Sequence, residues 1–164
     1  MEKFTFFFRT ASPFSQWHPC QFTIDDVVFT SAEQYMMYKK AELFGDENRM
    51  TAILATDQPR DQKKLGRAVT PFDAEKWNEA SYQVVYDASK AKFSQNEELL
   101  GQLLSTKGTT LVEASPFDTI WGIGLSEKNP KAQNRNTWRG QNRLGEILTK
   151  VREELMNAQK HNTP

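Results

Sequence analysis

"SAEQYMMYKKA", Ser31–Ala41, is the stretch from which the fold and the chemistry are predicted most directly. Its polar and apolar residues alternate in the manner of an amphipathic helix. Thr30 or Ser31 can cap the start of such a helix, and Gly45 can end it. We therefore predict a helix from about residue 31 to about residue 45.

Glu33, in the first turn of this helix, has two interpretations. In the first, it belongs to a capping box, whose acid or amide bonds back to a backbone N–H. Both Thr30-x-x-Glu33 and Ser31-x-x-Gln34 fit that pattern. In this interpretation Glu33 only stabilises the helix end.

In the second interpretation, Glu33 performs chemistry. At helical spacing one face of the helix carries Glu33, Met37, Lys40 and Phe44. A carboxylate on a largely apolar face is costly unless it is paired, and such a setting tunes its pKa. Lys40, two turns further on, could then contact a phosphate of a ligand. The sequence leaves both interpretations open.

Around this helix the pattern predicts short strands and further helices. We expect a strand over 4–9, a hairpin over 21–30 and a strand over 109–115. Helices are expected over about 46–55, 59–67, 73–93 and 96–106, with a last one marked by the stripe Leu144, Ile147, Leu148, Val151 and Leu155. The fold class is therefore α+β: a small, mainly helical single domain with a few short strands. We place the domain at 1–157 and a polar C-terminal tail at 158–164.

Composition limits the classes of partner. The 164 residues carry 21 Lys and Arg and 21 Asp and Glu, so the net charge is zero. This balance argues against broad coating of nucleic acid but allows a local basic pocket. The single cysteine, Cys20, permits no internal disulfide, which indicates a cytoplasmic and possibly nuclear setting, and we expect it to be buried and inert. No apolar run is long enough for a membrane span, and His18 and His161 stand apart from any metal-ligand cluster, so we expect neither membrane nor metal.

A second candidate acid is Asp118 in "SPFDTIWGIG". An aspartate after Ser-Pro-Phe often does no more than form a turn. Here it precedes Trp121, Gly122 and Gly124, and glycines beside an indole let backbone approach a stacked planar ligand. The segment 121–142 is long for a loop in a compact domain, which indicates function or disorder.

Further basic and aromatic residues also have two interpretations. The stretch "KLGR", residues 64–67, is either a solvated helix end or a phosphate-binding group beside a helix terminus. Trp77 suits a helical core position, and loop residues Trp17 and Trp138 could line a pocket.

Six segments in order resemble one family: "SPFSQW" (12–17), "TSAEQYMMYKKA" (30–41), "KLGRAV" (64–69), "FDAEKW" (72–77), "DTIWGIG" (118–124) and "GQNRLGEIL" (140–148). From about Phe6 to Leu155 the chain is similar to the NADAR superfamily, associated with NAD and ADP-ribose and related to bacterial N-glycosidases of riboflavin-pathway intermediates. One departure is that the family's frequent "FSNF" form is "FSQW" here, at residues 14–17.

The resemblance implies an enzyme that hydrolyses a ribose–base N-glycosidic bond without a cofactor. Its expected substrate is ADP-ribosylated guanine, in guanosine or in nucleic acid, and the implied process is DNA repair. No obligate protein partner is evident. One alternative is the same chemistry on a phosphoribosylamino-pyrimidine intermediate of riboflavin synthesis. Another is a module that binds ADP-ribose or a nucleotide without cleaving it.

The resemblance also assigns residues. Family catalytic positions fall on Glu33, Asp118 and Trp77. The substrate-binding candidates are Arg9, Ser12, Phe14, Lys40, Arg67, Trp121, Gly122 and Asn142. In this scheme Glu33 stabilises or protonates the reacting centre, Asp118 orients ribose or water, and Lys40 or Arg67 holds phosphate.

Overall fold

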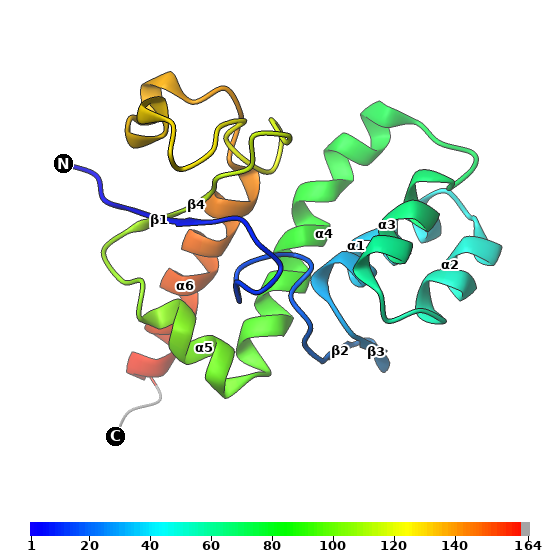
Figure 1. The fold of residues 1–164 in the computed structure, drawn as a ribbon. Helices are drawn as coiled ribbons and strands as arrows, with labels where there is room; N and C mark the ends of the chain where they lie inside the picture. The colour runs from blue at the N-terminus through cyan, green and yellow to red at the C-terminus, as the bar shows by residue number, and fades with distance from the viewer. Residues whose placement is uncertain (162–164) are drawn as a thin grey trace. The chain divides into compact units, whose positions relative to one another are not determined.

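The structure is a computed structural model that describes residues 1–161 (Figure 1). The chain divides into two compact units. Unit 1 consists of Met1–Ser15 together with the chain from Glu97 onward, and unit 2 is Gln16–Asn96. The residues predicted to form the site are divided between them.

Unit 2 is built around the predicted helix. Helix α1 (Ala32–Leu43) packs against α2 (Glu47–Leu54), α3 (Pro59–Arg67) and α4 (Ala74–Ser94). The contact between α1 and α3 is very close, because a Cβ atom at Gly66 would overlap the Met37 side chain. A glycine at this position therefore sets the separation of the two helices.

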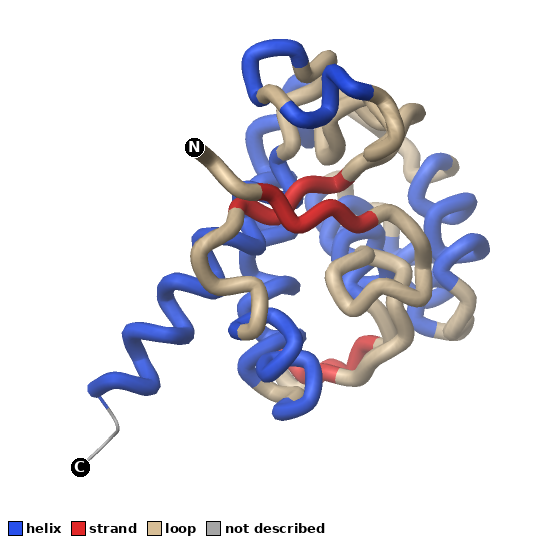
Figure 2. Tube along the Cα trace, turned by 60° about the vertical axis from the view of Figure 1, so that its left-hand side comes forward, coloured by secondary structure: helices blue, strands red, loops and turns tan. Residues whose placement is uncertain are grey.

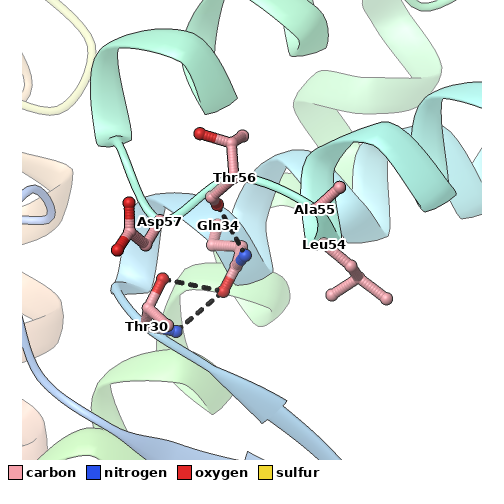
Figure 3. A pocket seen from close by; sticks show the side chains of 6 residues that line it. All are labelled: Thr30, Gln34, Leu54, Ala55, Thr56 and Asp57. Carbon is pink, nitrogen blue, oxygen red and sulfur yellow. Dashed lines mark hydrogen bonds between the residues drawn. The ribbon is translucent and has the colours of Figure 1, made fainter.

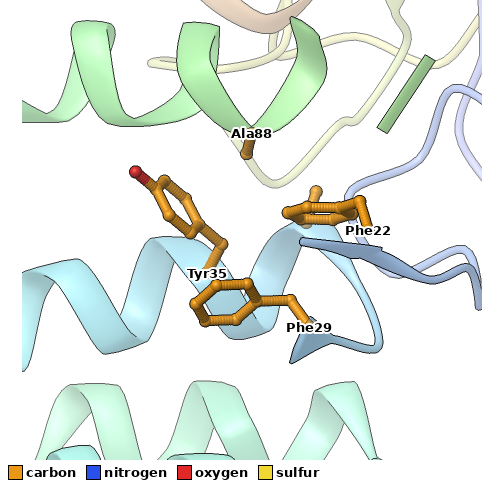
Figure 4. Close-up of a cluster of buried hydrophobic side chains, with 5 residues drawn as sticks. Phe22, Phe29, Tyr35 and Ala88 are labelled. Carbon is orange, nitrogen blue, oxygen red and sulfur yellow. The ribbon is translucent and has the colours of Figure 1, made fainter. Parts of the chain in front are cut away.

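A hairpin in unit 2 covers one part of α1. Strands β2 (Phe22–Ile24) and β3 (Val27–Phe29) pair antiparallel, and Asp25 and Asp26 between them both have positive φ, 50° and 66°. Such dihedrals match the right-handed twist of a two-residue hairpin. The hairpin brings its aromatic rings onto the helices, in the buried cluster Phe22, Phe29, Ala32, Tyr35 and Ala88 (Figure 4).

Unit 1 pairs the two strands that lie farthest apart in sequence. Strand β1 (Phe4–Phe7) runs parallel to β4 (Thr110–Glu113), with Phe4 opposite Thr110 (Figure 2). Helix α6 (Arg143–His161) packs on β4, and α5 (Glu97–Leu104) packs on α6. Its core cluster consists of Val112, Ala114, Ile123, Leu125 and Ala132, packed against Phe4, Phe6 and Trp138.

The predicted fold class is confirmed: the chain is α+β and mainly helical, with few short strands. The segment 121–142 is structured, because it contains the 3-10 helices η1 (Pro130–Gln133) and η2 (Arg135–Thr137). Helix α6 continues through His161, so residues 158–161 of the predicted polar tail are helical; the rest of that tail lies outside the described residues. Among residues 1–161, no helix is both long and apolar enough to cross a membrane.

Candidate active site

The start of α1 resolves the question of its cap. Ser31 is the N-cap residue, and its Oγ accepts a hydrogen bond from the Gln34 backbone N–H at 3.0 Å. Gln34 Oε1 in turn accepts from the Thr30 N–H at 2.7 Å. The cap therefore uses the Ser31 hydroxyl and the Gln34 amide, with Gln34 bonding the residue before the N-cap and not the N-cap N–H of an ideal capping box. Because Ser31 and not Thr30 is the N-cap, the Thr30-x-x-Glu33 box is not formed.

Glu33 is buried at this helix end, with only 6% of its surface exposed. Its backbone N–H donates to the Gln16 carbonyl at 3.0 Å, which fixes the preceding loop against the helix. A carboxylate in the first turn is favoured by the helix dipole, so burial at this place costs less than it would mid-helix. The chemical interpretation requires a Glu33 side chain that does not face bulk solvent, and the low exposure meets this requirement.

Lys40 lies among aromatic rings two turns along α1. Its Nζ is 4.7 Å from the centre of the Phe72 ring and 6.0 Å from that of Trp77. Burial lowers the pKa of Lys40, the charge of Glu33 opposes that shift, and the nearby positive charge of Arg67 adds to it. The structure thus brings the predicted site residues Glu33, Lys40, Arg67 and Trp77 together within unit 2.

Phe72 belongs to this cluster but was not predicted from the sequence. It is 48% exposed and makes an edge contact with Phe44, with ring centres 5.3 Å apart. Its segment is held by Asp46, whose Oδ2 accepts from the Thr70 N–H at 3.0 Å. The position of Phe72 in "FDAEKW", one of the segments that carried the resemblance, was the available signal.

Asp46 bonds two segments, one through each oxygen of its carboxylate. It is the N-cap of α2, where its Oδ1 accepts from the Arg49 N–H at 3.1 Å. The bond from Thr70 is the main reason that the pKa of Asp46 lies below its ordinary value, and the bond from Arg49 lowers it further. One ionised carboxylate therefore ties α2 to the segment that carries Phe72.

In unit 1, Asp118 forms the turn that the simpler interpretation predicted. Its Oδ1 accepts hydrogen bonds from the backbone N–H groups of Ile120 and Trp121, each at 2.8 Å. An aspartate in this role fixes the local backbone. A catalytic role for Asp118 stays a prediction.

The segment that follows Asp118 caps helix α6. Four consecutive N–H groups donate to carbonyls of this segment: Gln141 to Thr119, Asn142 to Gly122, Arg143 to Ile120 and Leu144 to Trp121. The approach is close, because a Cβ atom at Gly140 would overlap the Gly122 carbonyl oxygen. The segment 119–122 thus satisfies the N–H groups that a helix start leaves unpaired.

The side chain of Asn142, just before α6, bonds the backbone of strand β4. It is fully buried and adopts a positive φ of 53°. Its Oδ1 accepts from the Glu113 N–H and its Nδ2 donates to the Leu111 carbonyl, both at 3.0 Å. The amide therefore bonds the backbone of β4, a structural role that sequence reasoning missed. Its predicted contact with substrate stays a prediction.

Trp121 and Gly122 lie beside these groups. The Arg143 guanidinium is 4.8 Å from the centre of the Trp121 indole, a contact not predicted from the sequence. Gly122 is required sterically, because a Cβ there would lie 2.9 Å from the Glu113 carbonyl oxygen. The half-buried indole is thus held by a cation and by a tightly packed backbone.

The N-terminal candidates occupy a turn after β1. The Ser12 N–H donates to the Arg9 carbonyl at 2.9 Å, and Ser12 Oγ accepts from the Phe14 N–H at 3.3 Å. Phe14 is buried against Phe7, with ring centres 5.7 Å apart, whereas Arg9 is exposed. Only Arg9 and Ser12 of this group present polar surface.

A pocket of about 380 Å³ lies on unit 2, beyond the α1 cap (Figure 3). It is lined by Thr30, Gln34, Leu54, Ala55, Thr56 and Asp57, and none of these is a predicted site residue. Gln34 Nε2 donates to the Ile53 and Thr56 carbonyls, so this amide serves the fold. Within residues 1–161, no three His, Cys, Asp or Glu side chains gather as a metal ion would need.

Comparison with known proteins identifies the family. The model of the NADAR domain matches residues 6–156. The chain belongs to the NADAR family. It is 40% identical to the protein irg-1 of Caenorhabditis elegans over 172 aligned residues, covering 95% of this chain and 81% of that protein. It is 42% identical to an N-glycosidase of Acanthamoeba polyphaga mimivirus over 146 residues, covering 86% of each.

A solved structure supports the same assignment. The NMR structure of the E. coli protein YbiA superposes with a TM-score of 0.79 at 27% sequence identity. The match covers 97% of this chain and 89% of YbiA. The NADAR resemblance seen in the sequence is therefore confirmed, and the family fold extends over both units.

Proposed function

We propose that this chain is an N-glycosidase that removes ADP-ribose from ADP-ribosylated guanine, with Glu33 as the principal catalytic carboxylate. The observation that carries the proposal is the burial of Glu33 at a helix start that Ser31 and Gln34 already cap. The NADAR family membership and the N-glycosidase name of the mimiviral relative support the reaction class.

The chemistry suits a buried carboxylate. Cleavage of a ribose–nitrogen bond develops positive charge on the sugar, in an oxocarbenium-like state. A carboxylate held close to the anomeric carbon stabilises that charge and can activate the attacking water. Low exposure strengthens the effect, because few water molecules screen the interaction.

The cations of the same cluster suit the phosphates of ADP-ribose. Lys40 and Arg67 repel each other, as the lowered pKa of Lys40 reflects alongside its burial. A bound diphosphate between them would relieve this repulsion, and Lys40 would then hold its proton more tightly. Two cations match two phosphates better than the single phosphate of a phosphoribosylamino-pyrimidine, which favours the ADP-ribosyl substrate.

The aromatic groups suit the planar parts of the substrate. Phe72 and Trp77 flank Lys40 in unit 2, and Trp121 is held by Arg143 in unit 1. Each ring offers a face on which a base can stack. We assign Asp118 the task of orienting the turn that carries Trp121.

The test is a panel of N-ribosides with products identified by mass: ADP-ribosyl-guanosine, a phosphoribosylamino-pyrimidine and free ADP-ribose for binding. Wild type should cleave ADP-ribosyl-guanosine. Glu33→Gln should bind it with similar Kd but lose at least about a hundredfold in kcat. The matched control is Glu47→Gln, an exposed acid in the first turn of α2, which should behave as wild type.

Each result has a clear meaning. Full turnover by Glu33→Gln would move catalysis to another residue. Cleavage of only the pyrimidine riboside would replace the proposed substrate by the riboflavin intermediate. Tight ADP-ribose binding without cleavage of any riboside would make the chain a binding module.

A further inference from the structure

Helix α3, whose place in the chain Figure 1 shows, carries a row of basic residues. The row consists of Arg60, Lys63, Lys64 and Arg67, all exposed and spaced i, i+3, i+4 and i+7. Residues at this spacing lie on one helical face. The opposite face carries the buried Gln62 and Gly66, so the fold of unit 2 determines that the cations point outward. We name these four residues the α3 cation row.

The row is not neutralised by neighbouring acids. Among residues 1–161, the structure pairs none of the four cations with a carboxylate. Asp61 is exposed on the flank of the helix, and the Asp57 carboxylate before it accepts from the Gln58 amide. A chain of zero net charge therefore concentrates positive charge on this helix.

One end of the row leads to the candidate active site, and an aromatic side chain lies beside its middle. Arg67 is near enough to Lys40 to lower its pKa, and Lys40 borders Phe72 and Trp77. Lys63 Nζ is 5.8 Å from the centre of the half-buried Trp17 indole. Cations interleaved with aromatic faces are the usual surface for single-stranded nucleic acid.

We propose that the α3 cation row binds the phosphodiester backbone of a single-stranded nucleic acid and guides it toward the Glu33 site. From Arg60 to Arg67 the helix rises about 10 Å, enough for its cations to contact a few successive phosphates of one strand. The proposal rests on the proposed function only in taking the strand to carry the modified guanine. Binding of the strand itself does not depend on that chemistry.

The chemistry of the surface favours a nucleic acid over a lipid bilayer. Among residues 1–161, none of the large apolar side chains that are exposed lies on α3. A helix that binds in a membrane interface carries an apolar face to insert, whereas the inward face of α3 is polar and packed against α1.

The experiment measures binding of the full chain to an unmodified, fluorescein-labelled single-stranded 12-mer by anisotropy, at salt concentrations between about 50 and about 200 mM. The test variant is Lys63→Gln/Lys64→Gln. Loss of two phosphate contacts should lower the salt exponent by about 1.4 and reduce the ratio of Kd at 200 mM to Kd at 50 mM by about sevenfold. The control, Lys107→Gln/Lys128→Gln, removes two exposed lysines of unit 1 and should match wild type.

The same variants separate this proposal from the catalytic one. Lys63→Gln/Lys64→Gln should cleave ADP-ribosyl-guanosine like wild type but show a raised KM for an oligonucleotide that carries the modified guanine. Strand binding without cleavage of any riboside would overturn the catalytic proposal and leave this one standing. Absence of strand binding by wild type, equal weakening by the control, or binding only to phosphatidylserine vesicles would overturn the cation row proposal.

Discussion

Two acids were predicted to be catalytic, one in each unit, and the hydrogen bonds around them differ. In unit 2, Glu33 lies at a helix start where Ser31 accepts from the Gln34 N–H and the Gln34 amide accepts from the Thr30 N–H. In unit 1, Asp118 itself accepts from two backbone N–H groups. Each acid had a structural alternative in the sequence. Asp118 forms the turn that its alternative predicted, whereas the observed cap bonds at α1 are made by Ser31 and Gln34.

The difference lies in the neighbours of each acid. Around Glu33 the chain supplies a hydroxyl and an amide within three residues, so other side chains can cap the helix. In "SPFDTI" the Asp118 carboxylate is the strongest local acceptor, and the turn uses it. An acid is a better catalytic candidate when the backbone near it has other acceptors to use.

The neighbouring side chains Glu33 and Gln34 of α1 should differ most in their effect on stability. Gln34→Ala removes a buried amide that bonds Thr30, Ile53 and Thr56, so the free energy of unfolding should fall by about 2–3 kcal/mol. Glu33→Gln should change it by less than about 1 kcal/mol. Urea titrations of both variants measure this. If Glu33→Gln proved the more destabilising, the cap would depend on the carboxylate after all.

The next effect concerns the turn in unit 1. Asp118→Ala leaves the Ile120 and Trp121 N–H groups without their acceptor and should cost about 1–2 kcal/mol. Asp118→Asn retains the acceptor oxygen and should cost less than about 0.5 kcal/mol. Turnover of the Asn variant then decides the role of Asp118: near-wild-type kcat means that it only positions the turn, and a large loss means that the charge itself is used.

The smallest effect is a pH dependence in unit 1. Hydrogen bonds from Arg135 and Thr110 lower the pKa of Glu2 to about 2 from 4.5. Because the pKa is lowered in the folded state, the contribution is full above pH 4.5 and is lost as the pH falls toward 2. Glu2 is about a third exposed, so the effect should be below about 1 kcal/mol.

The measurement for Glu2 compares wild type with Glu2→Gln by thermal unfolding at pH 7 and pH 3. The difference in stability should be smaller at pH 3 than at pH 7. A difference that stayed constant would show that the Arg135 pair contributes nothing through charge.

Local signals in the sequence were enough to predict most elements. Helix α6 follows from amphipathic spacing, and other helices follow from caps such as Asp73, whose Oδ1 accepts from the Glu75 and Lys76 N–H groups. Helix α1 is buried all round its first turns, so its cap is the better signal. The hairpin at Asp25-Asp26 was predicted although this pair is weaker turn chemistry than Asn-Gly. Such features depend on residues within one or two turns of each other.

The parts that sequence could not predict depend on partners far along the chain. The Asn142 side chain forms hydrogen bonds with the backbone of Leu111 and Glu113 in β4, about thirty residues earlier in the chain. No local sequence pattern indicates these bonds. Trp138 packs on Phe4 with ring centres 5.3 Å apart, and its Nε1 donates to the Ala132 carbonyl, so it belongs to the core of unit 1. In the same way, Lys40, Phe72 and Trp77 come together only when α1 and α4 are folded.

The backbone bonds between 119–122 and the start of α6 limit how the 119–122 segment can move. The carbonyls of 119–122 accept from the N–H groups of 141–144, so the backbone of 119–122 can move away only if the bonds at the start of α6 break. We therefore expect the backbone of this segment to stay joined to α6. In hydrogen–deuterium exchange, the amides of 141–144 should be protected together and released together, at the same rate with and without ligand.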